Sequence, residues 1–589
     1  MISVERSFYD RFPQLEHGHS RKFAQPVVAL LRRIACEERI NGVLAALDPL
    51  TGFEFVEQAL RDFDVSYNVV NTDRENIPVD GRVVIVANHP LGALDALALI
   101  DLVGSVRRDV RILANDVLMQ LEQLRSLLLP LPVFGTADRR NSGGLREAYR
   151  ALEREEALIV FPAGTVSRVG AQGVRDARWS EGFVRLALKT SSPVLPVHIS
   201  AHNSPVFYGV SMVAKPLSAL LLAREMFGAA RTRIGFSIGA SVPVAALSAP
   251  KRPSPLLAQR MRAHVYCLPR RRPAVFPTEA AIAHPESPLA VRAALQRAEV
   301  LGATRDGKRI LLIGAQPDCP VLREIGRLRE LAFRRVGEGS GTRRDLDRFD
   351  GHYKHLLLWD EHALQIVGAY RIGEGGEILA TRGIGGFYSS TLFEWDARAH
   401  EFLRDSIELG RSFVQPAYWG SRSLDYLWQG IGAYLRTRPN VRYLVGPVSL
   451  SATLPQHSRE WIVHCHRHYF GDPDRFAHAR RPFDISPEVS AHAHAEWSGC
   501  DADEALRRLD VQLRAGQTSL PVLYRQYVDL CEADGVRFLD FGVDPAFGAC
   551  VDGLIRLDLE RLRPSKRKRY IEGQSGMEAS GGPTIQHVA

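Results

Sequence analysis

Cysteine is scarce in this chain: its 589 residues include seven cysteines, none of them in a C-x-x-C pair, at positions 36, 267, 319, 465, 500, 531 and 550. This excludes a secreted scaffold held by disulfides and fits a reducing compartment. Apolar runs of about 18 residues, the length that a transmembrane helix needs, are also absent. The most apolar stretch, residues 83–103, is interrupted by Asp95 and Asp101, so we predict no transmembrane helix. Residues 1–23 carry charges throughout, and no secretory signal is expected there.

A strong excess of one charge is missing as well. The chain has 75 basic and 67 acidic residues, a net charge of +8 that is small for its length. Such a charge permits an anionic membrane surface or an acidic partner and gives no argument for nucleic acid. The sequence contains no zinc-finger or RNA-binding signature. Apolar residues make up 45%, which excludes disorder over most of the chain and is enough for several cores without disulfide or metal staples.

The order of apolar patterns divides the chain into two α/β units. Residues 1–80 have the three-and-four spacing of helices. In 81–250, strand-like runs such as RVVIVA and ALIVFPA alternate with helix-like runs such as GLREAYRALERE, which predicts an α/β domain. The segment 251–304 is expected to form a helix and a linker rich in proline and arginine. A second α/β unit is expected over 305–571, and 572–589 is a small, polar tail expected to be disordered.

The first candidate site follows the run RVVIVA, where Asn88 and His89 begin a loop that reaches Asp95. A histidine at a strand end can act as a general base that takes the proton of an attacking hydroxyl. A nearby carboxylate fixes the ring tautomer and stabilises the imidazolium. A histidine near an aspartate in a loop is often only structural, so the pair alone does not establish a site.

Three later blocks strengthen this interpretation: PVFGTADRR at 132–140, VFPAGTVSR at 160–168 and VLPVHIS at 194–200. Together with the His–Asp block, and in this order, they resemble the glycerolipid and lysophospholipid acyltransferase family. That family transfers acyl groups from thioesters to alcohols. The resemblance covers roughly residues 60–245.

The resemblance implies roles for six residues. His89 and Asp95 would be catalytic, and four residues would bind substrate: Arg139, Arg140, Gly164 and Thr165. Arginine forks suit the carboxylate or phosphate of an anionic acceptor or donor. For Arg139 and Arg140, a solvated loop remains the alternative.

Two features depart from the family pattern. Five residues separate His89 from Asp95, where the family has four, and Ala163 stands where the family has glutamate. The missing glutamate argues against a glycerol-phosphate acceptor. The HPLG form of the first block resembles the branch of the family that acylates other lyso-lipids, which includes proteins labelled hemolysins.

The second candidate site includes residues 407–436, where the order strand, loop, helix resembles the GNAT acyltransferase core. In that core, N–H groups at a helix N-terminus hold the donor's pyrophosphate. The loop here is poor in glycine, which indicates a donor other than free coenzyme A. Over roughly 310–571 the chain resembles acyl-homoserine lactone synthases and, more closely, the ornithine N-acyltransferases of bacterial lipid synthesis. This resemblance rests on ELGRSFVQP, on HYFGDPD and on five residues: Asp347, Asp350, Arg371, Glu408 and Arg411.

The chemistry expected there is attack of an amino acid's α-amine on a thioester. Glu408 would take the amine proton, directly or through water, and Arg371 or Arg411 would hold the substrate carboxylate with two parallel hydrogen bonds. The alternative is a plain ion pair between Glu408 and Arg411. Strand alternation places residues three apart on opposite faces, which argues against that pair. Asp347 and Asp350 would bind substrate, or would cap local structure.

The two halves suggest consecutive steps, and a fusion in this order resembles the bifunctional ornithine lipid synthases. The resemblance implies that the C-terminal unit N-acylates ornithine from 3-hydroxyacyl carrier protein, and that the N-terminal unit O-acylates the resulting lyso-ornithine lipid. Expected partners are acyl carrier protein, the amino acid, the lyso-lipid and a membrane surface, with no nucleic acid and no cofactor. One alternative is a lysophospholipid acyltransferase whose second unit only docks the carrier. The other is a membrane-lytic protein, which the absence of amphipathic pore strands disfavours.

Three further segments bear on location and metals. We expect a peripheral protein at the cytoplasmic face of the bacterial inner membrane, held by the apolar segment 216–228 and the basic cluster 561–569. For the apolar segment an ordinary core helix remains the alternative, and for the basic cluster the alternatives are contact with carrier protein or a solvated surface. His464, Cys465, His466 and His468 look like a metal cluster. Because neighbours alternate sides in an extended chain, no metal is expected there.

Overall fold

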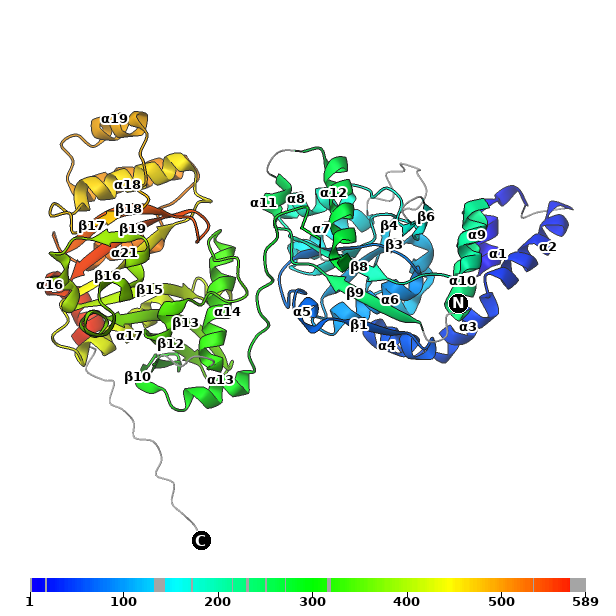
Figure 1. Ribbon diagram of the computed structural model, residues 1–589, viewed down its shortest axis with the longest axis horizontal. Coiled ribbons are helices and arrows are strands. Elements are labelled where there is room, and N and C mark those ends of the chain that lie inside the picture. The colour runs from blue at the N-terminus through cyan, green and yellow to red at the C-terminus, as the bar shows by residue number, and fades with distance from the viewer. Residues whose placement is uncertain are drawn as a thin grey trace, which may run out of the picture. The chain divides into compact units, whose positions relative to one another are not determined.

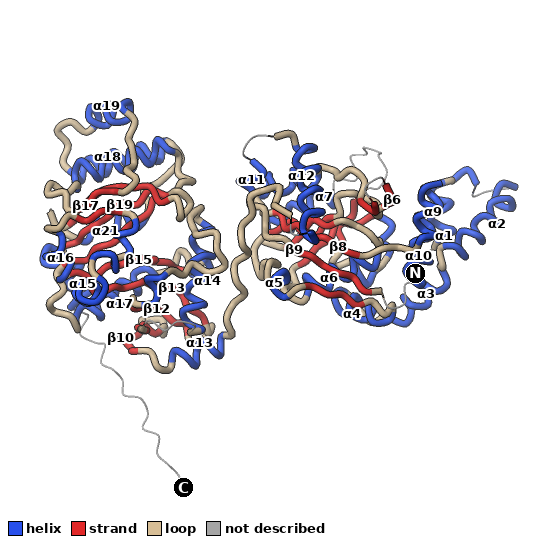
Figure 2. Tube along the Cα trace, viewed as in Figure 1, coloured by secondary structure: helices blue, strands red, loops and turns tan. Residues whose placement is uncertain are grey.

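The structure is a computed structural model, and it describes residues 3–15, 19–131, 143–170, 173–213, 215–228, 232–248, 252–270, 272–314, 319–532 and 534–572. The chain forms two compact units, residues 1–284 and 285–589 (Figure 1). Each unit is a mixed sheet with helices packed against it, so the predicted α/β class with two α/β domains is confirmed (Figure 2).

The first unit is built on a seven-stranded sheet in the order β1-β9-β8-β2-β5-β3-β4. Neighbouring strands are parallel except for the pair β8 and β9. The strands of this sheet are β1 (Ser66–Val69), β2 (Val83–Ala87), β3 (Val110–Asn115), β4 (Leu128–Leu131), β5 (Ala157–Val160), β8 (Val194–Ser200) and β9 (Arg233–Ile238). All five residues of β2 are buried, as expected for a central parallel strand covered on both faces.

Helices cover both faces of this sheet. On β2, Val83 and Ile85 belong to a core with α4 and α6, whereas Val84 and Val86 belong to a core with α7, α8 and α12. The helices are α1 (Val4–Arg11), α2 (His19–Ile34), α3 (Glu37–Ala46), α4 (Gly52–Asp62), α5 (Asn71–Arg74), α6 (Ala93–Gly104), α7 (Gly143–Glu153), α8 (Gly182–Thr190), α9 (Pro205–Val213), α10 (Lys215–Gly228), α11 (Val244–Ser248) and α12 (Ser254–Cys267). A hairpin of β6 (Arg168–Gly170) and β7 (Gly173–Arg175) follows β5.

The second unit is built on an eight-stranded sheet in the order β10-β11-β12-β13-β15-β16-β19-β18. Its strands are β10 (Glu299–Ala303), β11 (Arg309–Ile313), β12 (Lys354–Asp360), β13 (Gln365–Glu374), β15 (Ser406–Val414), β16 (Tyr443–Leu450), β18 (Val536–Asp544) and β19 (Cys550–Asp558). Neighbours are antiparallel except for β15 and β16, which run parallel and pair only over Ser406–Glu408 and Tyr443–Val445. β14 (Phe393–Trp395) and β17 (Ala477–Ala479) form a separate two-stranded sheet.

Helices also pack on both faces of the second sheet. One core joins the sheet to α13 and α14, and another joins it to α17, α18, α19, α20 and α21. The helices are α13 (Pro288–Leu295), α14 (Pro320–Arg335), α15 (Gly375–Arg382), α16 (Ala399–Arg404), α17 (Ser423–Arg436), α18 (Gln456–Phe470), α19 (Pro487–Glu496), α20 (Ala502–Ala515), α21 (Val522–Leu530) and α22 (Pro564–Lys566). Figure 1 shows α18 and α19 near the β17–β18 edge of this unit.

Three segments differ from the sequence-based expectation. The largely helical region 1–80 also contains β1, which pairs in parallel with β9. The division between units falls at 284/285, inside the expected helix and linker of 251–304, because α12 buries its apolar face in the first unit. His464–His466 lie on α18, not in an extended segment.

Within the described part of the chain, no helix combines the length and the apolar composition that crossing a bilayer requires.

Candidate active sites

The loop from β2 to α6 brings His89 and Asp95 together despite the additional residue between them. Gly92 caps α6 with φ of +92°, a backbone conformation that glycine adopts without steric cost. The turn this permits places Asp95 in the first turn of α6, with its Oδ1 atom 3.0 Å from His89 Nδ1. The longer spacing is therefore compatible with a His–Asp pair.

Asp95 is fully buried and is held from two sides. Its second oxygen accepts the Leu91 N–H at 2.8 Å, while its first faces the imidazole. The His89 ring stacks on Phe161 of the third block with 4.1 Å between ring centroids. Nδ1 is thus directed to the carboxylate, and Nε2 is the ring nitrogen that can take a proton from a hydroxyl.

The electrostatics of the pair favour a charged imidazole. Burial lowers the pKa of His89. The charge of Asp95, the hydrogen bond between His89 and Asp95, and the charge of Asp176 all raise it. The net effect is a pKa above the ordinary value of 6.5. The imidazolium that forms when His89 accepts a proton is therefore stabilised by two carboxylates.

The other predicted residues of the first unit divide into two groups. Gly164 and Thr165 are exposed on a turn directly after β5, where Gly164 has φ of +64°. This turn adjoins the His89 loop, because the Ser167 N–H donates to the His89 carbonyl at 2.7 Å. Arg139 and Arg140 lie outside the described residues.

Two residues of this site were missed by the sequence reasoning. Asn88 exchanges two hydrogen bonds with Ile199, donating at 2.9 Å and accepting at 2.7 Å, and so ties the His89 loop to the fourth block. Asp176 accepts the His89 N–H. Asn88 could have been found from its place before the histidine, but Asp176 lies 87 residues away and stands in no recognised motif.

In the second unit, Arg371 and the two predicted aspartates form one cluster. Arg371 is fully buried on β13, and its guanidinium lies 2.6 Å from Asp347 and 3.4 Å from Asp350. Asp347 and Asp350 also form a capping box at the start of a short 3₁₀ helix. Burial would raise the pKa of Asp350, but the charges of Arg329 and Arg371 hold it well below its ordinary value. Asp347 and Asp350 therefore cap local structure and also form ion pairs with Arg371.

Arg411 does not follow strand alternation, because β15 contains a β-bulge at this point. Arg371 pairs with Gly410 while Ala369 pairs with Phe413, so Arg411 and Ser412 together face one residue of β13. Arg411 has φ of +49°, which is strained for a non-glycine residue. The expectation that Glu408 and Arg411 point to opposite faces, which assumed a regular strand, is wrong.

The partners of Arg411 are the loop carboxylates and two rings. Its Nε lies 3.0 Å from Asp345, its Nη2 lies 3.7 Å from Asp347, and its Nη1 donates to the Tyr388 hydroxyl at 2.9 Å. The guanidinium sits 4.7 Å from the ring centroids of both Tyr388 and Phe547. Arg411 is thus paired with aspartates rather than with Glu408, and a substrate carboxylate would compete with them.

Glu408 is buried and both of its oxygens are engaged. One oxygen accepts a hydrogen bond from the Tyr353 hydroxyl, and it also accepts one from the Tyr388 N–H at 2.9 Å. The other oxygen accepts the Ser389 N–H at 2.9 Å. Through Tyr388, whose hydroxyl accepts from Arg411, this carboxylate is linked to the ion-pair network. The geometry supports a positioning role for Glu408 and leaves its predicted role as a base untested.

Two further acidic groups, Glu338 and Asp552, are close enough to Arg411 for its charge to lower their pKa values. Burial raises the pKa of Glu338 to about 7, although its hydrogen bond to Ser449 and the charge of Arg411 lower it. Burial and the charges of Asp544 and Glu338 raise the pKa of Asp552 to about 7. The register places Asp552 opposite Ser449, so these groups meet on one face of β16, β18 and β19. They were not found from the sequence, which contains no motif there.

The two segments that were predicted to meet a membrane make contacts within their own units. In α10, Phe227 packs on Phe63 at 5.4 Å between ring centroids, which places this apolar side chain against protein. In the cluster 561–569, Arg563 donates to the Cys531 carbonyl and Arg569 pairs with Asp425 at 2.6 Å. Some of the side chains that were expected to contact a membrane are therefore engaged by other residues of the protein.

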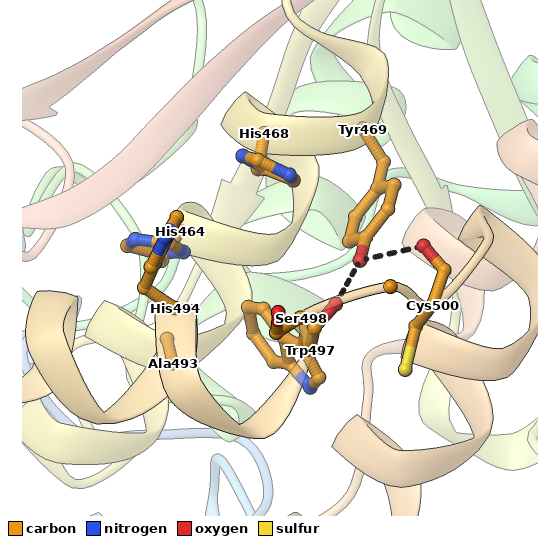
Figure 3. A pocket seen from close by; sticks show the side chains of 9 residues that line it. His464, His468, Tyr469, Ala493, His494, Trp497, Ser498 and Cys500 are labelled. Carbon is orange, nitrogen blue, oxygen red and sulfur yellow. Dashed lines mark hydrogen bonds between the residues drawn. The ribbon is translucent and has the colours of Figure 1, made fainter.

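Two histidines of α18, His464 and His468, line a cavity of about 170 Å³ (Figure 3). His464 and His468 are one helical turn apart, with ring centroids separated by 6.3 Å, and His494 of α19 lies beside them. Trp497 and Tyr469 complete its apolar wall. In the part of the chain that the structure describes, no group of three or more His, Cys, Asp or Glu residues is arranged to hold a metal ion.

Comparison with known proteins finds a separate acyltransferase match in each half of the chain. Residues 12–250 match the Acyltransferase family, and residues 328–429 match the family described as acetyltransferase (GNAT) domain. A glycine N(alpha)-acyltransferase of Phocaeicola vulgatus is 29% identical over 275 residues, which are 45% of this chain and 83% of that protein. A lyso-glycine lipid O-acyltransferase of the same organism is 29% identical over 235 residues, 39% of this chain and 82% of that protein.

A third relative has a different amino acid in its name. The L-ornithine N(alpha)-acyltransferase of Brucella abortus is 30% identical over 265 residues, 41% of this chain and 82% of that protein. Together with the GNAT match, this similarity shows that the chain contains an N-acyltransferase domain of the GNAT type. The chain therefore belongs to the acyltransferase family that includes the Brucella abortus enzyme, and it joins a domain of this kind to a second acyltransferase domain in one polypeptide.

Proposed function

We propose that the protein makes a diacylated amino-acid lipid in two steps. The second unit would acylate the α-amine of ornithine with a 3-hydroxyacyl group, and the first unit would then esterify the hydroxyl of that group. The observation that carries this proposal is the presence in one chain of an Acyltransferase and a GNAT domain, with relatives named for an N-acyl and an O-acyl step.

The geometry at His89 suits the ester step. His89 Nε2 would take the proton of the lyso-lipid hydroxyl while its oxygen attacks the thioester carbonyl. As the new C–O bond forms and the C–S bond breaks, the leaving thiolate takes the proton back from the imidazolium. Asp95, 3.0 Å from Nδ1, would hold the ring and stabilise its charged form throughout.

The choice of ornithine rests on charge. The names of the relatives do not separate ornithine from glycine, because the identities are 30% and 29%. Glu338, Asp544 and Asp552 lie near Arg411, and burial keeps the pKa values of Glu338 and Asp552 near 7. A second ammonium group beside them would favour their ionised forms, which supports an acceptor with a basic side chain over glycine.

The amide step needs a thioester donor and a neutral amine. Acyl carrier protein is our proposed donor, because the loop of Gly420–Ser423 is poor in the glycines that a free coenzyme A pyrophosphate would meet. Arg371 and Arg411 would hold the network of Asp345 and Asp347 in place around the acceptor, in addition to any direct contact.

One experiment tests the whole proposal. The gene is expressed in a bacterium that lacks amino-acid lipids, and its lipids are analysed by mass spectrometry with isotope-labelled ornithine or glycine in the medium. Diacyl lipid with labelled ornithine is expected. Labelled glycine in that lipid would contradict the head group, and the absence of any amino-acid lipid would contradict the function.

A second candidate is a lyso-lipid acyltransferase whose second unit only docks the carrier. The observation that favours it is that Arg371, Arg411 and Glu408 all have partners within the unit. A fragment of residues 285–589, which forms its own compact unit, distinguishes the two functions. We expect this fragment to convert ornithine and 3-hydroxyacyl carrier protein to lyso-lipid. A folded fragment without this activity would favour the docking function.

We also propose that the protein works at the cytoplasmic face of the inner membrane as a peripheral protein. The proposal is supported by its lipid acceptor and by basic residues such as Arg561 and Lys568, since each basic residue near an anionic surface contributes about 1 kcal/mol, screened by salt. High salt or alkaline carbonate should release the protein from membrane fractions. Retention through both washes, with release only by detergent, would contradict this attachment.

A further inference from the structure

We propose that Asp176 is a positioning residue for the ester step, which fixes the backbone of His89 while Asp95 fixes its ring. The inference rests on the proposed function of His89 as the base. Asp176 directly follows β7 and is 3% exposed. Its Oδ1 accepts the His89 N–H at 3.2 Å, so the carboxylate contacts the main chain of the very residue that would transfer the proton.

The carboxylate also joins the third block to the His89 loop. Besides the His89 N–H, Asp176 Oδ1 accepts the Ser167 hydroxyl, while the Ser167 N–H donates to the His89 carbonyl at 2.7 Å. Both sides of the His89 residue are therefore held, one by Asp176 and one by Ser167, in a closed ring of three hydrogen bonds. A rotation of the loop about His89 would break at least two of them.

The β6–β7 hairpin explains how Ser167 and Asp176 meet. Arg168 pairs with Arg175 in the antiparallel ladder, so Ser167 and Asp176 are the next residues on each strand and lie opposite each other. The hairpin thus brings a hydroxyl and a carboxylate to one point beside His89. Ser167 and Asp176 lie on either side of the β6–β7 hairpin, far in the sequence from His89, which follows β2.

Other groups hold Asp176 itself in place. Its Oδ2 accepts the Trp179 indole N–H at 2.8 Å. Its backbone N–H donates to the Tyr266 hydroxyl at 2.9 Å, and its carbonyl accepts from Arg262 at 2.7 Å. Tyr266 and Arg262 belong to α12, so the helix that buries its apolar face under the sheet also anchors the residue that positions His89.

Charge gives Asp176 an effect that a neutral residue could not have. Burial raises the pKa of Asp176, although its hydrogen bonds from Ser167, Trp179 and His89 lower it. Its charge adds to that of Asp95 in raising the pKa of His89. Asp176 thus stabilises the imidazolium as well as its position. Replacing it with asparagine keeps the size and removes the charge, and the amide N–H₂ would face either the Trp179 indole N–H or the donors of His89 and Ser167.

The test compares Asp176→Asn and Asp176→Glu in the full chain. The substrate is an N-(3-hydroxyacyl)-ornithine in detergent micelles with an acyl thioester, and kcat and KM are measured across pH. For Asp176→Asn we expect kcat to fall about ten- to hundred-fold, by analogy with the partners that orient metal-binding side chains, with KM for the lipid unchanged. The acid limb of the pH profile should move to lower pH, because His89 loses a negative neighbour and its pKa falls.

Asp176→Glu separates position from charge. It retains the charge and displaces the carboxylate, so kcat should fall while the acid limb stays where it is. Wild-type kcat and an unchanged acid limb in the asparagine variant would overturn the proposal. If the asparagine variant does not fold, as judged by circular dichroism, the glutamate variant decides, and a wild-type kcat there would overturn the proposal equally.

His89→Ala distinguishes failure of this inference from failure of the proposed function. If His89→Ala is inactive in the ester step while Asp176→Asn behaves like the wild type, only the role of Asp176 is wrong. If His89→Ala retains the ester step, the site itself is misassigned, and the role of Asp176 falls with it.

Discussion

Replacement of His89 by alanine is expected to lower the rate of the ester step by about 10² to 10⁴-fold, the usual contribution of a positioned general base. The amide step should be unchanged, because His89 lies in the first compact unit and the predicted N-acylation residues lie in the second. Lipid extracts of cells that produce the variant should accumulate mono-acylated amino acid. The measurement is mass spectrometry of these extracts, with purified protein assayed for each step.

Two further variants sharpen this result. His202→Ala, which removes an exposed histidine of the same unit, should leave both steps unchanged. Asp95→Asn should resemble His89→Ala in the ester step, because its amide would no longer hold the imidazole in the right tautomer. A normal amount of diacyl lipid from the His89 variant would remove the imidazole from the reaction and with it the proposed base.

The elements that carry the sites could be predicted from the sequence because their patterns are local. The run SIELGRSFV coincides with β15, and RVVIVA covers β2. The pairing of His89 with Asp95 also followed from one short loop, in which a single glycine with positive φ absorbs the additional residue. In such segments, apolar period and turn chemistry point to the same structure.

What could not be predicted depends on contacts between distant segments. The side of the strand on which Arg411 lies is decided by a bulge, which alternation does not reveal. Asp176 reaches His89 across 87 residues, and Asp345 reaches Arg411 from a loop before β12. The helix that carries His464–His466 was missed for a local reason, since a short polar segment has no clear period.

The contacts of Glu408 lead to the second large effect. In a glutamine at this position the amide oxygen could replace only one carboxylate oxygen. Its N–H₂ would face either the Ser389 N–H or the Tyr353 hydroxyl and the Tyr388 N–H, which are donors that the carboxylate now accepts. A buried donor without an acceptor costs about 1–3 kcal/mol, so the free energy of unfolding should fall by that amount. The amide step should fall as well, because Tyr388 is the residue through which Glu408 is linked to Arg411.

Two measurements on Glu408→Gln separate positioning from proton transfer. Thermal unfolding and the rate of N-acylation of ornithine are followed for this variant and for Glu394→Gln, whose carboxylate is exposed and paired with Arg480 at the surface. Glu394→Gln should match the wild type in both. If Glu408 positions the network, its variant should lose stability and activity together, and the slow rate should not recover at high pH. If the variant keeps its full stability, loses only the rate and regains it as pH rises and the amine deprotonates unaided, then Glu408 is the base and the positioning role is wrong.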